Sequence, residues 1–395
     1  MQCIEISRVI LRDRLTAQME RSVAESRITA ILGPRQCGKT TLARAFYAQE
    51  QAAGRAVAWF DCENPRDVAR LANPLLTLEA LTGTIIIDEF QRLPQLAEIL
   101  RVLSDRTPLP AKFIVLGSAS PDIIRKSSES LAGRVRFLDM PGFTLDEVGI
   151  PDAPTLWARG GFPESYLAVS EAASLQWREN FIRTFLERDV PQLGYRMPAE
   201  RLRRFWSMCA HYHGQTWNGS AIASSMGMSS MMMGDYLDLL TGAFVMRRLP
   251  AWHGNLGKRL VKAPKAYVRD SGLVHALLGI PDLSALQGHP KLGASWEGFA
   301  LDQILAITGD RHAYFWGTHG GAEIDLVLES KGKLWGVEFK YADAPRLTPS
   351  MRSALTDLNL EHLWVVHPGT ESFPLTDEVD VLALGDSAKL LEAVQ

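Results

Sequence analysis

The chain has 395 residues, of which 46% are hydrophobic and 22% are charged. This length suggests two or three domains, and the composition is ordinary for a soluble globular protein with an ample core. The formal net charge of -3 excludes a global electrostatic attraction to nucleic acid or membrane, so any such binding must rest on local patches.

The cysteines and the hydropathy pattern indicate where the protein resides. Four cysteines are scattered without paired spacing, which favours a reducing cytoplasm over a disulfide framework or a cysteine zinc site: Cys3, Cys37, Cys62 and Cys209. The N-terminus carries charged residues among its apolar ones and lacks the apolar core of a signal peptide. No stretch approaches the ~20 apolar residues of a membrane span. We therefore expect a cytoplasmic protein with no membrane partner.

The first predicted elements surround a glycine-rich loop. Residues 6–24 have helical spacing, and residues 28–32 are typical of a short buried strand. Residues 33–40, GPRQCGKT, fit the phosphate-binding P-loop pattern. A helix is predicted to start at residues 41–46. In this strand, turn and helix arrangement, converging backbone N–H groups and the helix dipole favour a bound anion.

The loop predicts a site for ATP and Mg²⁺. Lys39 is expected to reach the β- and γ-phosphates, and Thr40 to hold the metal ion. The alternative is a chance match within a loop, which the neighbouring strand and helix argue against. The predicted nucleotide-binding residues are Gly33, Pro34, Arg35, Gln36, Cys37, Gly38, Lys39, Thr40 and Thr41.

Acidic and polar residues end the later strands of this region. After a strand at residues 56–60, the apolar run 84–87 ends in Asp88 and Glu89, where open α/β sheets bind ligands. Asp88 is expected to bind the nucleotide Mg²⁺ in the Walker B role, and Glu89 is placed to polarise the attacking water. Ser118 ends the next strand, where it is placed to sense the γ-phosphate or orient the water.

This succession of strands indicates an AAA-type ATPase, a class that usually needs an arginine from a neighbouring subunit. Arg134 is the candidate for this arginine, with Arg125 and Arg136 as rivals. A surface salt bridge is the alternative role for Arg134. If the arginine acts in this way, the protein is a homo-oligomer.

Several motifs together resemble one group of prokaryotic AAA-type ATPases that carry a C-terminal domain of long-unknown function. The motifs lie at residues 33–40, 86–91, 116–120, 131–134, 160–164 and 188–190, so the resemblance covers nearly the whole chain. The resemblance implies ATP binding more firmly than it implies any pathway.

The middle of the chain predicts a connector followed by a winged helix. Residues 151–154 are typical of a linker, and residues 171–189 of a connecting helix. Three helices are then expected at 201–212, 220–226 and 229–240, followed by a β-hairpin whose first strand covers residues 244–249. This order is the winged-helix arrangement.

The winged-helix region is basic. Residues 196–270 contain 11 Arg or Lys and 4 Asp or Glu, a balance of 11 − 4 = +7. This balance suggests a surface that faces phosphates, and hence DNA as a partner. The alternative is a spacer for protein interactions. The methionine-rich third helix offers few groups that read base edges, so sequence-specific recognition is not expected. His211 and His213 are expected to pack in an ordinary way rather than to bind metal.

The C-terminal region contains a second chemical pattern. Residues 324–329 and 334–340 alternate as two strands around a turn at Lys331 and Gly332. This register sets Asp325 opposite Glu338, about 5 Å apart between Cβ atoms. Because like charges in such positions destabilise a hairpin, we expect a divalent cation to offset them. Lys340 lies on the same face as Glu338.

Asp and Glu-x-Lys on adjacent strands resemble the catalytic layout of the restriction-endonuclease-like nucleases. The resemblance implies Mg²⁺ held by Asp325 and Glu338, with Glu297 of the preceding helix assisting and Lys340 acting on the attacking water. A following helix at 351–358 and a strand at 362–366 are expected. The alternative is a degenerate nuclease fold kept for binding.

The predicted fold class is α/β in three parts. These are an AAA-type P-loop ATPase core (1–150), a helical connector and winged helix (151–285), and a restriction-endonuclease-like domain (286–395). The predicted function is an ATPase coupled to a Mg²⁺-dependent nuclease that acts on DNA. The alternatives are an ATP-switched binding or regulatory protein with a silent nuclease fold, and a signalling ATPase of the kind used in phage defence.

Overall fold

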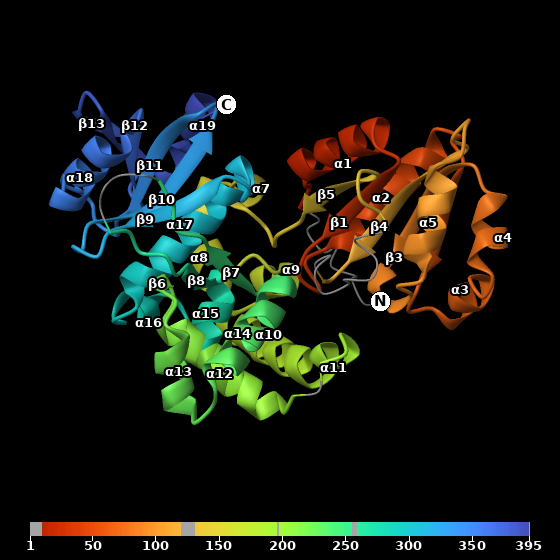
Figure 1. Ribbon diagram of the computed structural model, residues 1–395, viewed down its shortest axis with the longest axis horizontal. Helices are drawn as coiled ribbons and strands as arrows, with labels where there is room; N and C mark the ends of the chain where they lie inside the picture. Colours follow the sequence, from red (N-terminus) through yellow and green to blue (C-terminus); the bar gives the residue numbers. More distant parts are fainter. Residues whose placement is uncertain (1–9, 120–130, 196, 255–258, 395) are drawn as a thin grey trace, which may run out of the picture. The chain divides into compact units, whose positions relative to one another are not determined.

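The chain divides into two compact units. The fold is that of a computed structural model, which describes residues 10–119, 131–195, 197–254 and 259–394. Residues 1–143 with 242–244 form unit 1, and residues 144–241 with 245–395 form unit 2. Figure 1 labels the elements of each unit. The two C-terminal parts that the sequence predicts as separate domains therefore lie in one compact unit, and the three-part division stays a prediction.

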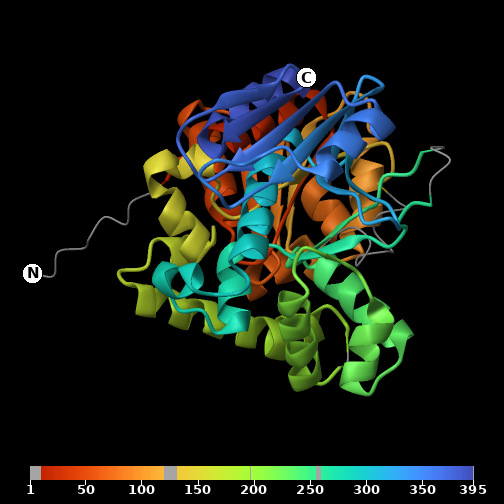
Figure 2. The same cartoon turned by 90° about the vertical axis from the view of Figure 1, so that its left-hand side faces the viewer.

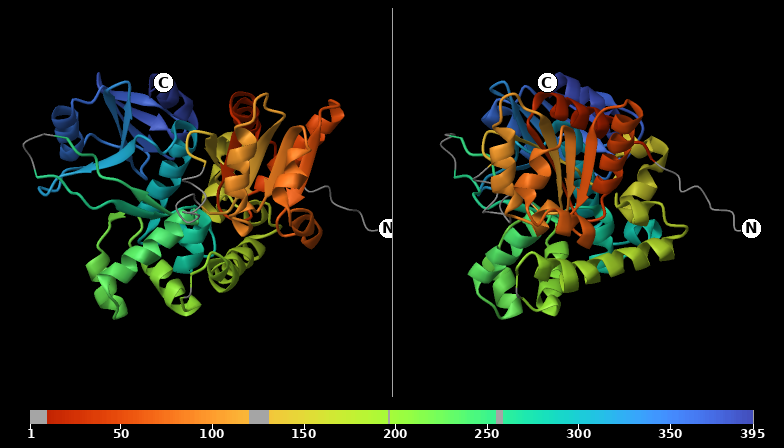
Figure 3. Two further views of the ribbon diagram at one scale, coloured as in Figure 1. Left: turned by 45° about the vertical axis from the view of Figure 1, so that its right-hand side comes forward. Right: turned by 90° about the vertical axis from the view of Figure 1, so that its right-hand side faces the viewer.

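Unit 1 is built around a parallel sheet of five strands in the order β2-β3-β4-β1-β5. Because all strands run the same way, their carboxyl ends share one edge, where polar residues can gather. Helices lie on both faces of this sheet (Figure 3). Its elements are α1 (Asp13–Glu25), β1 (Ile28–Leu32), α2 (Lys39–Ala52), β2 (Val57–Asp61), α3 (Pro65–Arg70), α4 (Pro74–Glu79), β3 (Gly83–Asp88), α5 (Leu96–Ser104), β4 (Ala111–Gly117) and β5 (Val135–Asp139).

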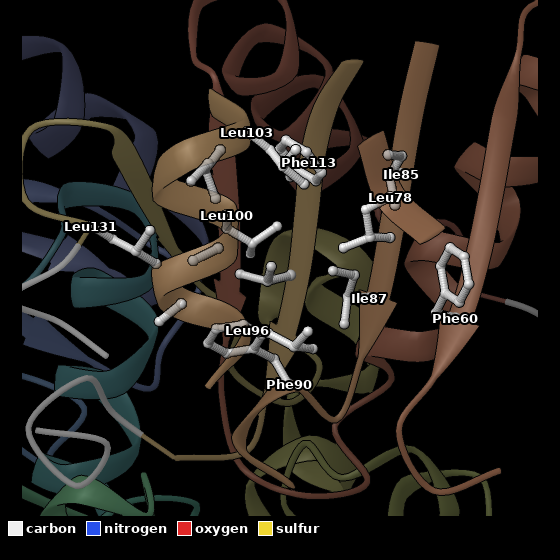
Figure 4. Packing of buried hydrophobic residues seen from close by; sticks show 14 of the residues in the cluster. Phe60, Leu78, Ile85, Ile87, Phe90, Leu96, Leu100, Leu103, Phe113 and Leu131 are labelled. Atoms are coloured by element: carbon white, nitrogen blue, oxygen red, sulfur yellow. The ribbon is translucent and has the colours of Figure 1, made fainter. Parts of the chain in front are cut away.

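Alternate side chains of β3 enter two hydrophobic layers, as the period of a strand requires. Ile85 and Ile87 belong to the cluster drawn in Figure 4, together with Leu96 and Leu100 of α5. Ile86 belongs to a second cluster, which contains residues of α1 and α2. Burial on both faces explains why Ile85, Ile86 and Ile87 are all apolar, and Asp88 follows them at the carboxyl edge of the sheet.

Unit 2 begins with a helical region and a small antiparallel sheet in the order β6-β8-β7. From α12 onward the element order is helix, strand, helix, helix, strand, strand. The elements are α7 (Leu145–Val148), α8 (Ala153–Arg159), α9 (Pro163–Tyr166), α10 (Glu171–Thr184), a π-helix (Phe185–Asp189), α11 (Val190–Gln192), α12 (Ala199–His211), β6 (Gln215–Thr216), α13 (Gly219–Met226), α14 (Ser230–Gly242), β7 (Met246–Leu249), β8 (Lys265–Val268), α15 (Ser271–Leu278) and α16 (Leu283–Gln287).

A large aromatic residue anchors the helices of this region. Trp206 of α12 is 0% exposed. Its ring lies edge-on to Phe185 of the π-helix, with 5.4 Å between the ring centroids. Such a pair buries much apolar area and also fixes the relative orientation of two elements.

The glycine pair of the 160–164 motif forms a corner in unit 2. Gly160 has φ +78°, and a Cβ there would lie 2.1 Å from Asp270 Oδ1. The backbone N–H of Gly161 donates to Asp270 Oδ2 at 2.6 Å. The other Asp270 oxygen accepts the N–H of Leu273 and so caps α15. Burial raises the pKa of Asp270 to about 6. This part of the motif therefore has a structural role, because only glycine fits at position 160.

The C-terminal sheet of unit 2 has the order β13-β14-β12-β11-β10-β9, with β11, β12 and β14 mutually parallel. Helix α17 packs against β11, and α18 packs against β10 and β11; Figure 2 shows α17 beneath this sheet. The elements are α17 (Leu292–Thr308), β9 (Ala313–Gly317), β10 (Glu323–Ser330), β11 (Lys333–Phe339), α18 (Pro349–Leu358), β12 (His362–His367), β13 (Phe373–Thr376), β14 (Val379–Ala383) and α19 (Ser387–Val394).

The hairpin of β10 and β11 has the predicted register. Its ladder pairs Leu326 with Val337 and Leu328 with Trp335, and it closes at the predicted two-residue turn. The predicted helix after β11 and the strand that follows it are also confirmed, as α18 and β12. None of the helices in the described ranges has the length together with the apolar character that a bilayer crossing requires.

Candidate active site

The loop between β1 and α2 has the geometry of an anion cradle. Gly38 has φ +100° and no side chain caps the N-terminus of α2, so the first N–H groups of the helix are available to a ligand. A Cβ on Gly33 would lie 2.1 Å from the carbonyl oxygen of Met140, which makes glycine obligatory there. Both glycines of the pattern therefore meet a backbone requirement.

Lys39 places its charge inside this loop. The side chain is 5% exposed, and Nζ donates to the carbonyl oxygens of Gly33 and Pro34 at 2.9 and 2.8 Å. A buried ammonium held by neutral carbonyls and, at 3.9 Å, by Cys37 Sγ is well suited to an anionic ligand, because a phosphate oxygen would form a stronger charge-assisted bond. The loop residues thus fit the triphosphate of ATP.

The other predicted loop residues have separate positions. The Arg35 guanidinium pairs with Glu63 at 3.3 Å. Gln36 has φ +63° and is exposed, and Cys37 is buried with Sγ 3.4 Å from the carbonyl oxygen of Met140. Thr41 lies in α2 with its side chain exposed. Their roles in nucleotide binding stay predictions.

Thr40 and Asp88 come together although they are 48 residues apart. Thr40 Oγ1 donates to Asp88 Oδ2 at 2.9 Å. Burial raises the pKa of Asp88, while the hydrogen bond from Thr40 acts in the opposite direction. A hydroxyl and a carboxylate oxygen at this spacing fit the ligand preference of Mg²⁺. The assignment of both residues to the metal is consistent with this geometry and stays a prediction.

Glu89 and Ser118 are joined by a residue that the sequence reasoning did not assign. Glu89 has φ +50°, an uncommon conformation for a residue with a side chain. Gln91 donates through Nε2 to a Glu89 carboxylate oxygen and to Ser118 Oγ, the latter at 2.9 Å. Gln91 follows Glu89 by two residues, in the short 3₁₀ turn Phe90–Arg92. It therefore holds the candidate base beside the end of β4.

Replacing Gln91 with alanine is expected to lower kcat for ATP hydrolysis by about 10- to 100-fold, because misplacing a catalytic group has effects of this size. Nucleotide affinity should change little, since Gln91 does not contact the loop. Steady-state hydrolysis and equilibrium binding of a fluorescent ATP analogue separate the two quantities. Gln95→Ala, which alters an exposed glutamine four residues later, is the control. A loss confined to affinity would contradict the positioning role.

Arg12 clamps the glycine-rich loop to the segment that follows β5. Its guanidinium donates to the carbonyl oxygen of Cys37 at 3.1 Å, to that of Pro141 at 3.1 Å and to that of Gly142 at 2.7 Å. The same guanidinium lies 5.5 Å from the ring centroid of Phe143. We call this arrangement the Arg12 clamp. Its partners lie 25 to 130 residues away, so no local sequence pattern indicated it.

The arginine candidates occupy ion pairs within unit 1. Arg134 forms a bidentate pair with Asp105, with nitrogen to oxygen distances of 2.7 and 2.8 Å. Arg136 pairs with Glu25. The predicted rival Arg125 lies outside the described residues. Within one chain, Arg134 therefore adopts the surface salt bridge that was the alternative to a role in a neighbouring site.

The predicted C-terminal residues do converge, around a lysine that was not predicted. Lys265 of β8 is 2% exposed. Its Nζ lies 3.2 Å from Glu297 Oε1, 2.6 Å from Glu323 Oε1 and 2.8 Å from Asp325 Oδ1. Lys340 Nζ pairs with Glu338 Oε1 at 2.6 Å. The acids come from α17, β10 and β11, so three elements and β8 build one centre.

Burial and mutual repulsion set the charges of these acids. Burial and the charge of Asp325 raise the pKa of Glu338 to about 8 and that of Glu297 to about 7. For Asp325, burial is outweighed by Lys265, which lowers the pKa. Burial alone would lower the pKa of Lys265, but Asp325 and the neighbouring acids hold it well above its usual value. The other Glu338 oxygen, Oε2, is buried with no hydrogen-bond partner.

The arrangement around Lys265 does not fit a divalent cation as it stands. The sequence predicts a divalent cation that offsets the repulsion between Asp325 and Glu338. In the structure, the ammonium of Lys265 forms the ion pair with Asp325 instead. Among the described residues, no group of three or more His, Cys, Asp or Glu side chains is arranged to hold a metal ion. The assignment of Glu297, Asp325 and Glu338 as metal ligands stays a prediction.

Part of the basic balance of residues 196–270 is paired with acidic side chains. Arg247 is buried against Asp302 and Asp310, Arg269 lies near Asp310, and Arg248 pairs with Asp238. Three of the basic residues in 196–270 are thus paired with acids. Two of these acids, Asp302 and Asp310, lie outside that range and were not included in the balance of +7. His213 packs as expected, with its Nδ1 accepting the N–H of Val268, and burial lowers its pKa to about 3.

Known families and proteins match nearly the whole chain. The family described as an AAA domain matches residues 25–149, and two domains of unknown function, DUF8612 and DUF4143, match residues 150–284 and 292–386. The uncharacterized protein Rv2008c of Mycobacterium tuberculosis is 48% identical over 373 residues, which cover 94% of this chain and 83% of that protein. The uncharacterized protein Mb2031c of Mycobacterium bovis gives the same values.

The chain belongs to the Rv2008c family. Its first 150 residues carry an AAA-type ATPase domain, as the match to residues 25–149 shows. Among solved structures, this family member is similar to the Walker-type ATPase PABY2304 of Pyrococcus abyssi, with a TM-score of 0.49 and 15% identity over 68% of this chain and 96% of that chain. It is also similar to AMPPCP-bound DnaA from Aquifex aeolicus, with a TM-score of 0.30 and 13% identity over 59% of this chain and 89% of that chain.

Proposed function

We propose that this protein is a nucleotide-operated switch that binds ATP at residues 33–41 and hydrolyses it with Glu89 as the base. The observation that carries the proposal is the set of hydrogen bonds at the carboxyl edge of the unit 1 sheet. Thr40 is bonded to Asp88, and Gln91 ties Glu89 to Ser118. The AAA domain match supports ATPase activity, and the geometry supports the assignment of roles.

Each side chain has one task in this proposal. Lys39 and the first N–H groups of α2 bind the phosphates. When bound, Mg²⁺ held by Thr40 and Asp88 neutralises phosphate charge. Glu89 accepts a proton from the attacking water, and Gln91 fixes the carboxylate for that transfer. Ser118 lies at the end of β4, where it orients the same water.

Replacing Lys39 with alanine tests the first task. We expect ATP affinity to fall by about 100-fold, because the hydrogen bonds of a charged group contribute about 1.5–3 kcal/mol each. Equilibrium binding of a fluorescent ATP analogue measures the change. Arg44→Ala is the matched control, since Arg44 is an exposed cation on the same helix. Unchanged affinity in the Lys39 variant would contradict the assignment of the loop.

A homo-oligomer would allow Arg134 to act on a neighbouring nucleotide. In this proposal Arg134 leaves Asp105 when a second copy docks and then stabilises charge on the transferred phosphate. Dependence of the specific ATPase rate on protein concentration measures this directly. A rate that is constant over the range in which the oligomer dissociates would exclude a shared site.

A second candidate function is Mg²⁺-dependent cleavage of DNA by the C-terminal centre under the control of ATP. The convergence of Asp325, Glu338, Lys340 and Glu297 favours it, and the element order from α12 to β8 is consistent with a winged helix that contacts DNA. Plasmid incubated with Mg²⁺ or Mn²⁺, with and without ATP, tests this candidate beside a Lys340→Ala variant. If nothing is cut, the centre is silent and the protein is an ATP-switched binding or regulatory protein.

A further inference from the structure

We propose that Lys265 is a built-in counter-cation that keeps the Asp325 centre free of metal, and that a divalent cation can bind there only after the ammonium withdraws. We call this arrangement the Lys265 lock. The proposal deepens the second candidate function. It concerns metal binding alone, so it can be tested whether or not the centre cleaves DNA.

The contacts of Lys265 are those that a metal ion would need. Its Nζ lies within 3.2 Å of oxygens from Glu297, Glu323 and Asp325. Mg²⁺ requires oxygen ligands at about 2.0–2.1 Å in octahedral geometry. A divalent cation bound to the same oxygens would therefore lie nearly where Nζ lies. Two cations cannot share that position, so binding of one excludes the other.

A buried oxygen shows that the centre has capacity for a further positive group. Glu338 has a side chain that is 8% exposed, and only one of its oxygens is paired, with Lys340. Its Oε2 is buried without a partner. A buried carboxylate oxygen that lacks a donor carries a large desolvation cost. A metal ion replacing Lys265 could use this oxygen as a ligand, whereas the lysine does not reach it.

The backbone of β8 lets the side chain move without a change of fold. Lys265 pairs with Thr216 of β6 and with Leu249 of β7, so its main chain is fixed on both sides. The four methylene groups of the side chain carry the ammonium to the acids, so in this proposal the ammonium withdraws by a change of side-chain rotamer. The lock is therefore one side chain rather than a mobile domain.

Lys265→Met removes the charge and keeps most of the volume, so it provides the direct test. Full-length wild-type protein and the variant are titrated with Mn²⁺ by calorimetry, and thermal melts are recorded with and without Mn²⁺. The matched control is Lys262→Met, which changes an exposed lysine three residues earlier. A double variant, Lys265→Met with Asp325→Asn, distinguishes this centre from the Thr40 and Asp88 site.

We expect Lys265→Met to bind one Mn²⁺ per chain more than wild type, with affinity at least 10-fold higher at this centre, and to gain thermal stability from the ion. Lys262→Met should match wild type, and the double variant should lose the added site. The proposal is overturned if Lys265→Met gains no site, or if wild type already binds Mn²⁺ through Asp325 equally well.

Because Lys265→Met leaves buried acids without their cation, the variant can fail to fold, and a second variant is needed. Lys265→Met combined with Glu323→Gln removes the charge of the half-exposed Glu323, which also pairs with Lys265, and leaves Glu297, Asp325 and Glu338 in place. It should still gain a Mn²⁺ site, because oxygens of Glu297, Asp325 and Glu338 remain. A variant that binds Mn²⁺ but leaves plasmid intact would reject the cleavage candidate while supporting the lock.

Discussion

Replacing Glu89 with glutamine is expected to slow ATP hydrolysis by about 10²- to 10⁴-fold, the usual contribution of a positioned base. Glutamine has nearly the same shape and retains an acceptor for the Gln91 amide, but it cannot take a proton from water. Nucleotide affinity should be kept, because Glu89 lies outside the glycine-rich loop. The variant should therefore accumulate bound ATP.

Single-turnover hydrolysis together with equilibrium nucleotide binding distinguishes this result from unfolding. Glu98→Gln provides the matched control, because Glu98 is exposed on α5. We expect this control variant to hydrolyse ATP at the wild-type rate. Hydrolysis at the wild-type rate in the Glu89 variant would mean that another group acts as the base, and the contacts of Gln91 would then be structural.

Replacing Trp206 with alanine is expected to lower the free energy of unfolding of unit 2 by about 3–5 kcal/mol, as for other buried aromatic residues. The side chain is 0% exposed and packs on Phe185, so its removal leaves a cavity where α12 meets the π-helix. Urea unfolding followed by tryptophan fluorescence is suited to this measurement. Trp59 is the one tryptophan of the sequence before residue 144, so nine of the ten tryptophans of the wild type, and eight of the nine of the variant, report on unit 2.

Met231→Ala is the control for this experiment. Met231 of α14 is 80% exposed, and its truncation should change the stability by no more than about 0.5 kcal/mol. A Trp206 variant as stable as this control would show that the helical region of unit 2 does not depend on the aromatic contact.

The elements and their local chemistry could be predicted from the sequence because each has a short-range signal. The P-loop spacing predicted the turn between β1 and α2, and the apolar run before Asp88 predicted a buried strand. Alternation around Lys331 and Gly332 predicted the register of β10 and β11, which the structure confirms. These features depend on residues that are neighbours in sequence.

The partners of the site residues could not be predicted because they come from distant parts of the chain. Lys265 of β8 lies 60 residues before Asp325 of β10, to which its side chain donates a hydrogen bond. For the same reason, the count of charges in residues 196–270 did not reveal that Arg247 is paired with acids 55 and 63 residues away. Gln91 had a local signal, because it follows Glu89 by two residues.

The Arg12 clamp has a mechanical consequence for the segment by which the chain leaves unit 1. Met140 accepts the Cys37 thiol and donates its own N–H to Leu32 at 2.7 Å, while Arg12 grips Cys37 and Pro141 together. The polypeptide leaves unit 1 at Phe143, three residues after Met140. Because Arg12 donates to the loop at Cys37 and to this exit segment at Pro141, we expect the two segments to move together when a ligand enters the loop.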